Sequence, residues 1–400
     1  MLIVLNVILL LFKNIDGNEE FQLNKEDKPL ELQVHNCAGT YYITINFNGL
    51  FEIKTERINL ELPFSLFSAN ILPLESKNIK YLGKEFVLFK EKIPLDHCQD
   101  HIRFQEWKDN QTIPLDFYFY ESNFPFHYKD QGFGFAFKMK NSNFDIIKQL
   151  KKHNFIQKEV FSVQTLTPTM SRLLFSLLPQ KDILLYTYKG ICNVDTKYDT
   201  WGCRMKKVVI DSNITYENDE YAYFQYSERE IYAPNGFIET IRTTFLKDLL
   251  ELGICLYHDL SENNGSSYFE CDCDNIPDIK IWFYLGNYRY SFNLKDLFEK
   301  KYRESCFMLI QKNINNKYTW ILGSSFLVNY ATEFDYENKK VTLYGNNIIE
   351  QVYFEVNQEM INKIVRGIIY FSFFCCSIGI ILFCFQKYLL QKSDSYSEKE

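Results

Sequence analysis

The chain has 400 residues, of which 46% are hydrophobic and 17% aromatic, enough for one large domain or for two lobes that each have a core. Charged residues make up 24% and the formal net charge is −7, without the basic stripe that nucleic-acid binding needs, so we expect no nucleic-acid partner. The abundant Tyr and Phe, with Ile and Val, favour strands over helices.

The chain opens on an apolar run at residues 2–12, broken only by Asn6. Its length is typical of the core of a signal peptide, although no basic residue precedes it and Lys13 follows. The run predicts a signal peptide over residues 1–17, with cleavage near Gly17.

The part of the chain between its two ends is expected to consist of short strands separated by turns. Alternating apolar residues predict strands, and Asn48-Gly49 supplies a two-residue hairpin turn between the first two. Apolar residues at helical spacing predict short helices at 144–153 and 237–250. The pattern indicates an all-β sandwich or barrel-like architecture with few helices. The expected strands are 41–47, 51–57, 208–215, 221–225, 280–284 and 341–344.

Near the C-terminus, residues 367–385 form an uncharged stretch that is apolar apart from Ser372 and Ser377. A helix of this length spans roughly 28 Å, enough for a bilayer core. The alternative, a buried helix of a soluble domain, is disfavoured because the stretch has no polar face. With the N-terminal signal, it predicts a type I single-pass protein of the secretory pathway or cell surface, with a juxtamembrane segment at 351–366 and a cytosolic tail at 386–400.

Eleven cysteines are divided between this span and the rest of the chain. Cys375, Cys376 and Cys384 lie inside the span, and the other eight, an even number, suit an oxidising compartment. Three N-glycosylation sequons lie on the same side of the span, at Asn110, Asn213 and Asn264.

No cofactor is expected, and the one arrangement that resembles a metal site is incomplete. His97 and His101 have the spacing of one helical turn, but a second ligand pair is missing and a disulfide-bonded Cys98 would not bind zinc. We expect no metal.

Two segments resemble pepsin-like aspartic proteases. Residues 320–323 (Trp-Ile-Leu-Gly), followed by Phe326, Tyr330 and the Asp-x-x-Asn-x-x-Val spacing at 335–341, are similar to the C-terminal signature of that family. Residues 130–137 (Asp-Gln-Gly-Phe-Gly-Phe-Ala-Phe) resemble its first-lobe segment, in which a glycine lets two backbones cross beneath the catalytic loop.

The resemblance implies an all-β, bilobal pepsin-like fold, with an N-terminal lobe at 18–165 and a C-terminal lobe at 166–350. Cys271 and Cys306 resemble the ends of the family's second-lobe disulfide loop, and Cys192–Cys203 is expected as a short local bridge. The remaining pairs are Cys37–Cys98 and Cys255–Cys273.

Catalysis in this family needs two aspartates, each in Asp-Thr-Gly or Asp-Ser-Gly, that share one proton. Neither triplet occurs in the chain. Counting back from Pro234 puts Gln225 at the second aspartate and Ser227 at its glycine. In the first lobe two placements compete: either Asn59 or Lys54 falls on the aspartate. Neither amide nor ammonium can take the shared proton, so no catalytic residue is expected.

Asp211 is a further candidate for a catalytic aspartate. Asp211-Ser-Asn resembles a catalytic loop with its glycine replaced, but it lies close behind the first lobe and better resembles the strand before the second loop. The sequence has no clear counterpart of the family's substrate flap, and Tyr81-Leu-Gly83 is the best candidate for its tip.

Three functions follow from the resemblance. The first is a membrane-anchored, catalytically inactive homologue, whose interlobe cleft could still bind a peptide or protein by strand-like hydrogen bonds. The second is an active endopeptidase with an unrecognised pair, such as Glu56 or Glu61 with Asp211. The third is a structural surface glycoprotein, because a fold does not fix a function.

Overall fold

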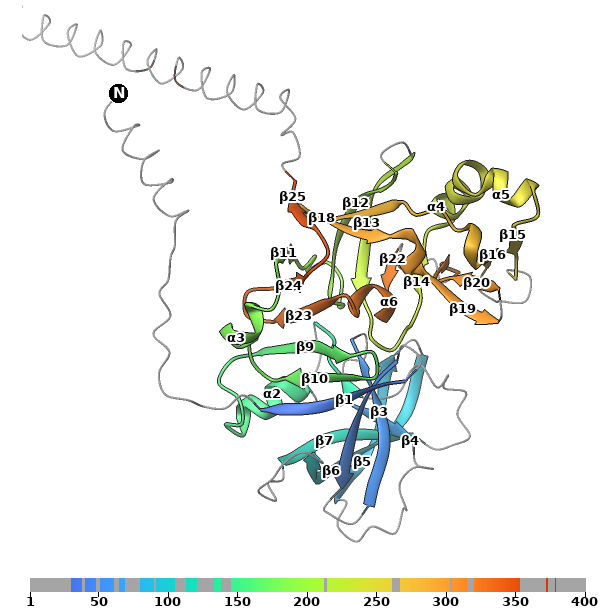
Figure 1. Cartoon of the computed structure of the whole chain (residues 1–400). Coiled ribbons are helices and arrows are strands. Elements are labelled where there is room, and N and C mark those ends of the chain that lie inside the picture. The colour runs from blue at the N-terminus through green and yellow to red at the C-terminus, as the bar shows by residue number, and fades with distance from the viewer. Residues whose placement is uncertain are drawn as a thin grey trace, which may run out of the picture. The chain divides into compact units, whose positions relative to one another are not determined.

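The computed structural model divides into two compact units. The first comprises Met1–Gln180 and Glu333–Asn338, and the second comprises Lys181–Thr332 and Lys339–Glu400. Strands predominate in both and helices are few and short, which confirms the all-β fold class (Figure 1). The residues that the structure describes are 30–37, 40–47, 51–60, 65–68, 80–89, 91–104, 113–120, 133–137, 145–211, 214–260, 267–302, 304–314, 320–352, 372 and 378.

The first unit contains a sheet with the order β9-β10-β1-β2-β6-β7-β4, in which β3 pairs with β2 and β8, and β5 with β6. Leu32 and Val34 of β1 are fully buried while Glu31 and His35 on either side of them are exposed, because successive side chains of a strand face opposite ways. The strands are β1 (Glu31–Cys37), β2 (Thr40–Phe47), β3 (Phe51–Asn59), β4 (Leu66–Ser68), β5 (Lys80–Phe89), β6 (Glu91–Phe104), β7 (Ile113–Tyr120), β8 (Phe133–Gly134), β9 (Val160–Thr167) and β10 (Met170–Leu174).

Helix α2 (Ile146–Lys152) of this unit matches the helix expected at 144–153. Asp145 caps it, because its side chain accepts hydrogen bonds from the backbone N–H groups of Ile147 and Lys148. Ile147 and Leu150, one turn apart, are fully buried and hold the helix against the unit's core.

The second unit contains an eight-stranded sheet with the order β21-β14-β22-β13-β12-β17-β18-β25 and a four-stranded sheet with the order β15-β16-β20-β19. A further pair, β11 with β24, belongs to the same unit. The strands are β11 (Tyr188–Asn193), β12 (Gly202–Ile210), β13 (Ile214–Phe224), β14 (Ile231–Ala233), β15 (Cys255–His258), β16 (Tyr268–Asp272), β17 (Lys280–Leu285), β18 (Tyr288–Asn293), β19 (Phe298–Tyr302), β20 (Ser305–Met308), β21 (Ile310–Lys312), β22 (Trp320–Leu322), β24 (Lys340–Gly345) and β25 (Ile349–Gln351).

Strand β23 (Tyr330–Asp335) crosses the division between the units, and its last residues belong to the first. There Phe334 stacks on Phe161 of β9 with ring centroids 4.6 Å apart. The units divide after Gln180, whereas the sequence predicts a lobe boundary at 165/166. That boundary would cut β9, which pairs along its length with β10, and β10 pairs in turn with β1.

Two expected elements of the second unit differ in the structure. The strand expected at 208–215 is interrupted, because Asp211 has a positive φ of 48° in the turn where Ile210 pairs with Ile214. The helix expected at 237–250 consists of α4 (Asn235–Thr240), η3 (Ile241–Phe245), which is a π-helical turn, and α5 (Lys247–Glu251).

The expectations for both ends of the chain lie outside the described residues. These are the signal peptide at 1–17, nearly all of the stretch at 367–385 and the tail at 386–400. The expected hairpin turn at Asn48-Gly49 also lies outside the described residues. Within the described residues, no helix has the length and apolar character needed to cross a membrane.

Candidate functional site

The second unit holds a loop with the topology of a catalytic loop, between β13 and β14. Strand β22 lies between these two strands and pairs with β13 in parallel and with β14 in antiparallel fashion (Figure 1). The chain therefore leaves β13, passes over the end of β22 and returns along its other side. Residues 225–230 form this crossover.

Gly323, directly after β22, makes the crossover possible. A β-carbon on this residue would collide with the carbonyl oxygen of Glu230, and would lie 2.8 Å from that of Arg229. Only glycine lets two backbones approach so closely. The crossing is also hydrogen-bonded, because the N–H groups of Ser324 and Ser325 donate to the carbonyl oxygens of Glu228 and Arg229 at 2.8 and 3.0 Å.

Gln225 is the first residue of the loop. Phe224 lies opposite Leu322 in the parallel pairing, and the N–H of Gln225 donates to the carbonyl oxygen of Leu322 at 3.1 Å, so Gln225 comes level with Gly323. Its side chain is buried, and its Oε1 accepts a hydrogen bond from the N–H of Ser227 at 3.4 Å. The amide is therefore held back against its own loop.

The residues around Gln225 fix the position of the loop. Trp320, fully buried in β22, donates from its Nε1 to Glu220 Oε2 at 2.8 Å and packs against Phe237. Tyr226 and Ser227, the next two residues of the loop, are also buried. The loop thus has a rigid base, and it presents an amide where a carboxylate would be needed for acid–base work.

The first unit has the corresponding parallel pairing, between β3 and β8. Ile58 lies opposite Phe133, and Asn59 lies opposite Gly134. The flanking Ile58 and Leu60 are fully buried. After β8, the carbonyl oxygens of Phe135 and Ala136 accept from the hydroxyl of Tyr336 at 3.2 and 3.3 Å.

The two pairings place Asn59 and Gln225 in equivalent positions: Asn59 is level with Gly134, the last residue of β8, and Gln225 is level with Gly323, the residue after β22. Lys54, the competing first-lobe residue, lies further back on β3. It falls where the pairing with β2 is irregular, between the Glu56–Ile43 and Ile53–Ile45 pairs, and away from Gly134. The backbone register therefore favours Asn59 as the counterpart of Gln225.

The other sequence candidates lie elsewhere. Asp211 is exposed in the turn at the far end of β13, an 11-residue strand that measures roughly 35 Å at about 3.3 Å per residue. Tyr81-Leu-Gly83, the candidate flap tip, is not at a turn: it pairs with Cys98 and His97 near one end of the β5–β6 hairpin, whose strands meet at Phe89 and Glu91. Glu61 and the side chain of Glu56 lie outside the described residues.

Three disulfides are found in the described part of the chain. Cys192–Cys203 was expected, whereas Cys255–Cys271 and Cys273–Cys306 replace the expected Cys271–Cys306 and Cys255–Cys273. The reason is the position of Cys271 in the central strand β16, where it lies opposite Cys255 on one side and Cys306 on the other. Since Cys271 bonds to Cys255, Cys306 bonds to Cys273.

The other expected sites involve cysteines, histidines and sequon asparagines. The side chains of Cys37, Cys98, His97 and His101, and the sequon residues Asn110, Asn213 and Asn264, lie outside the described residues. Among the residues that are described, no group of three or more His, Cys, Asp or Glu side chains could hold a metal ion.

The chain is similar in sequence to a known protein family. Residues 97–344 match a family model described as eukaryotic aspartyl protease, and this range contains Gly134, Gln225 and Gly323. No significant match was found among curated proteins.

Proposed function

The chain belongs to the eukaryotic aspartyl protease family, and we propose that it is a membrane-anchored member that does not cleave peptides. The observation that carries the proposal is the pair of amides at equivalent places. Asn59 is level with Gly134, and Gln225 follows the residue opposite Leu322.

Catalysis in this family depends on proton transfer to and from a water molecule. In this family one carboxylate takes a proton from the attacking water while the other donates one, which requires two acids of different pKa. The amides of Asn and Gln do not titrate, so they can orient a water by hydrogen bonds but cannot deprotonate it. The loss of both members of a catalytic pair leaves no partial catalyst.

The surroundings of Gln225 support loss of chemistry without loss of structure. Gly323 and the hydrogen bonds to Glu228 and Arg229 maintain the crossover, while Tyr226 and Ser227 stand where the family has Thr or Ser and Gly. The loop therefore keeps the backbone crossover of the family but lacks the carboxylate that catalysis needs.

The membrane anchor and the secretory location rest on the sequence. The apolar stretch at 367–385 has the length of a bilayer-spanning helix. Three disulfides among the described residues fit an oxidising, extracellular or luminal environment. Binding of a peptide or protein ligand remains a prediction from the resemblance.

Proteolysis is tested with the full chain, purified in detergent with its disulfides intact. It should not cleave unfolded protein at any pH from roughly 3 to 7, the range in which carboxylates titrate, and pepstatin should leave any trace activity unchanged. Turnover that pepstatin abolishes would overturn the proposal and indicate an active endopeptidase.

The anchor is tested separately in cells. The full chain should resist extraction from membranes by alkaline carbonate, and a variant that ends at Val352 should be secreted. Extraction of the full chain by carbonate would refute the anchor while leaving the proposal on catalysis intact.

A further inference from the structure

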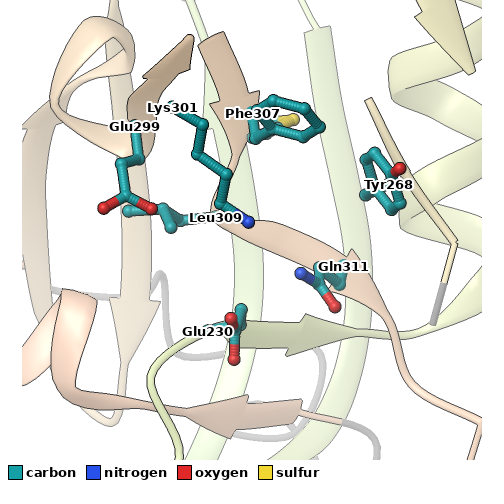
Figure 2. A pocket seen from close by; sticks show the side chains of 8 residues that line it. Glu230, Tyr268, Glu299, Lys301, Phe307, Leu309 and Gln311 are labelled. Atoms are coloured by element: carbon teal, nitrogen blue, oxygen red, sulfur yellow. The ribbon is translucent and has the colours of Figure 1, made fainter. Parts of the chain in front are cut away.

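A pocket of about 260 Å³ lies within the second unit, lined by residues from both of its sheets (Figure 2). This volume is below the roughly 300–1,000 Å³ of pockets for drug-sized molecules, so it suits a ligand as small as one amino-acid residue. Its lining residues are Glu230, Tyr268, Glu299, Lys301, Phe307, Met308, Leu309 and Gln311.

One side of the pocket carries acceptors. Glu299 Oε1 is paired with the guanidinium of Arg229, but Glu299 Oε2 is buried and has no hydrogen-bond partner among the described atoms. A buried carboxylate oxygen without a donor is costly, so this atom favours a ligand that brings an N–H group. Glu230 supplies a second carboxylate, whose Oε2 accepts a hydrogen bond from the hydroxyl of Tyr232 at 3.5 Å.

The same pocket carries donors. The ammonium group of Lys301 lies 4.9 Å from the ring centroid of Phe307, and no carboxylate of the described residues forms a salt bridge with it. Figure 2 shows the Lys301 side chain extending into the pocket between Glu299 and Gln311. Gln311 adds an amide that can donate or accept.

The remaining lining is apolar. Phe307 and Leu309 line the pocket beside the charged groups, and Met308 between them is buried. A ligand that fits this lining has a cation, an oxygen acceptor and an apolar group within one residue's length. An α-amino-acid unit with a free ammonium group meets all three requirements.

We propose that this pocket binds an α-amino-acid unit with a free ammonium group and an apolar side chain. The ammonium group donates to Glu299 Oε2 and Glu230, the carbonyl or carboxylate oxygen accepts from Lys301 and Gln311, and the side chain packs on Phe307 and Leu309. The unit is either a free amino acid or the first residue of a peptide. The inference does not depend on the loss of catalysis, so the protease assay and the binding assay succeed or fail independently.

The test is calorimetric titration of the full chain in detergent with L-phenylalanine, the tripeptide amide Phe-Ala-Ala-NH2 and its N-acetylated form. At least one free-amine probe should bind, and the acetylated peptide should not. Binding of L-phenylalanine alone assigns a free amino acid, whereas binding of the tripeptide assigns a peptide N-terminus.

Three variants locate the binding. Glu299→Gln and Lys301→Met should each weaken it by about tenfold or more, which is typical for loss of a charge-assisted hydrogen bond. Lys300→Met is the matched control, because Lys300 is the adjacent exposed lysine of β19 and does not line the pocket. Unchanged melting temperatures would show that the variants fold.

Three results would overturn the proposal: no binding of either free-amine probe, equal binding of the acetylated peptide, or unchanged affinity in both pocket variants. If Glu299→Gln unfolds because it loses the contact with Arg229, Lys301→Met and Gln311→Leu still decide the question. Both of those side chains lie in the pocket on strand edges rather than in the core.

Discussion

The α-carbon of Gly323 lies so close to the carbonyl oxygen of Glu230 that the two residues define the crossing of β22 with the loop above it. Backbone carbonyls on one side and a missing β-carbon on the other give this crossing its geometry. The adjacent N–H groups of Ser324 and Ser325 add hydrogen bonds to the same loop.

Gly323→Ala should destabilise the second unit by about 1–3 kcal/mol or more, because the added methyl group meets backbone atoms that cannot rotate away. Urea unfolding followed by tryptophan fluorescence measures the change, since Trp201, Trp282 and Trp320 all lie in this unit. Gly236→Ala is the matched control, because the atoms nearest to its β-carbon belong to the side chain of Tyr216, from 3.3 Å, and not to backbone. Equal stability of Gly323→Ala and the unaltered chain would refute the close approach of the two backbones at Gly323.

Restoration of one acid should not restore proteolysis. Gln225→Asp introduces a carboxylate into a buried loop, but Asn59 on β3 still offers no second titrating group. We expect the turnover of an unfolded protein substrate to stay at the background of the unaltered chain between about pH 3 and 7. Pepstatin-sensitive activity in this single variant would mean that another carboxylate serves as the partner of position 225.

Asp145 should make the first unit more stable in mild acid than at neutral pH. Burial raises its pKa from 3.8 to about 6, against the opposing effects of Lys148 and the hydrogen bonds from Ile147 and Lys148. Between these two pKa values the folded chain binds more protons than the unfolded one, so this contribution to stability is complete below about pH 4 and is lost as pH rises through 6. The loss amounts to roughly 2–3 kcal/mol.

Asp145→Asn tests this directly, because asparagine also caps helices but does not ionise. Thermal unfolding followed by circular dichroism should show the variant more stable than the unaltered chain at pH 7 and similar to it at pH 4. Asp248→Asn, at an exposed position of α5, is the control and should shift neither. An equal effect of Asp145→Asn at both pH values would contradict the raised pKa.

The disulfide pairs can be read from a digest of the non-reduced chain. An endoprotease that cleaves before aspartate separates Cys271 from Cys273, because Asp272 lies between them. Mass spectrometry should then find Cys271 linked to Cys255 and Cys273 linked to Cys306. Replacement of Cys255 and Cys271 by serine together should cost about 3 kcal/mol, as expected for a loop of this length. Recovery of a Cys271–Cys306 peptide would restore the pairing expected from the family.

Much of the fold could be predicted from local pattern. The expected strands at 41–47, 280–284 and 341–344 lie within a residue of β2, β17 and β24, because their β-branched and aromatic residues favour strands. Glycines at 134 and 323 could also be identified from their motifs, and both stand at the expected parallel pairings or beside them.

Most of the features that the sequence pattern did not predict depend on contacts between residues far apart in the chain. The turn at Asp211 is an exception, because Asp211, Ser212 and Asn213 are residue types that favour turns, and the strand expected at 208–215 runs through them. The unit boundary depends on β10 pairing with the distant β1. The pocket combines residues from 230 to 311, which no local motif brings together.

The register of β16 has a consequence for thiol–disulfide exchange. Cys271 faces a cysteine on each neighbouring strand, Cys255 and Cys306, without any change of alignment. If the Cys273–Cys306 bridge is reduced, the freed Cys306 thiolate can attack the Cys271 sulfur, forming Cys271–Cys306 and releasing Cys255 as a thiolate. The Cys271–Cys306 bridge implied by the family resemblance is therefore one reduction and one exchange away from the pairing found, with no change of strand register, and Cys255 and Cys273 are left as free thiols.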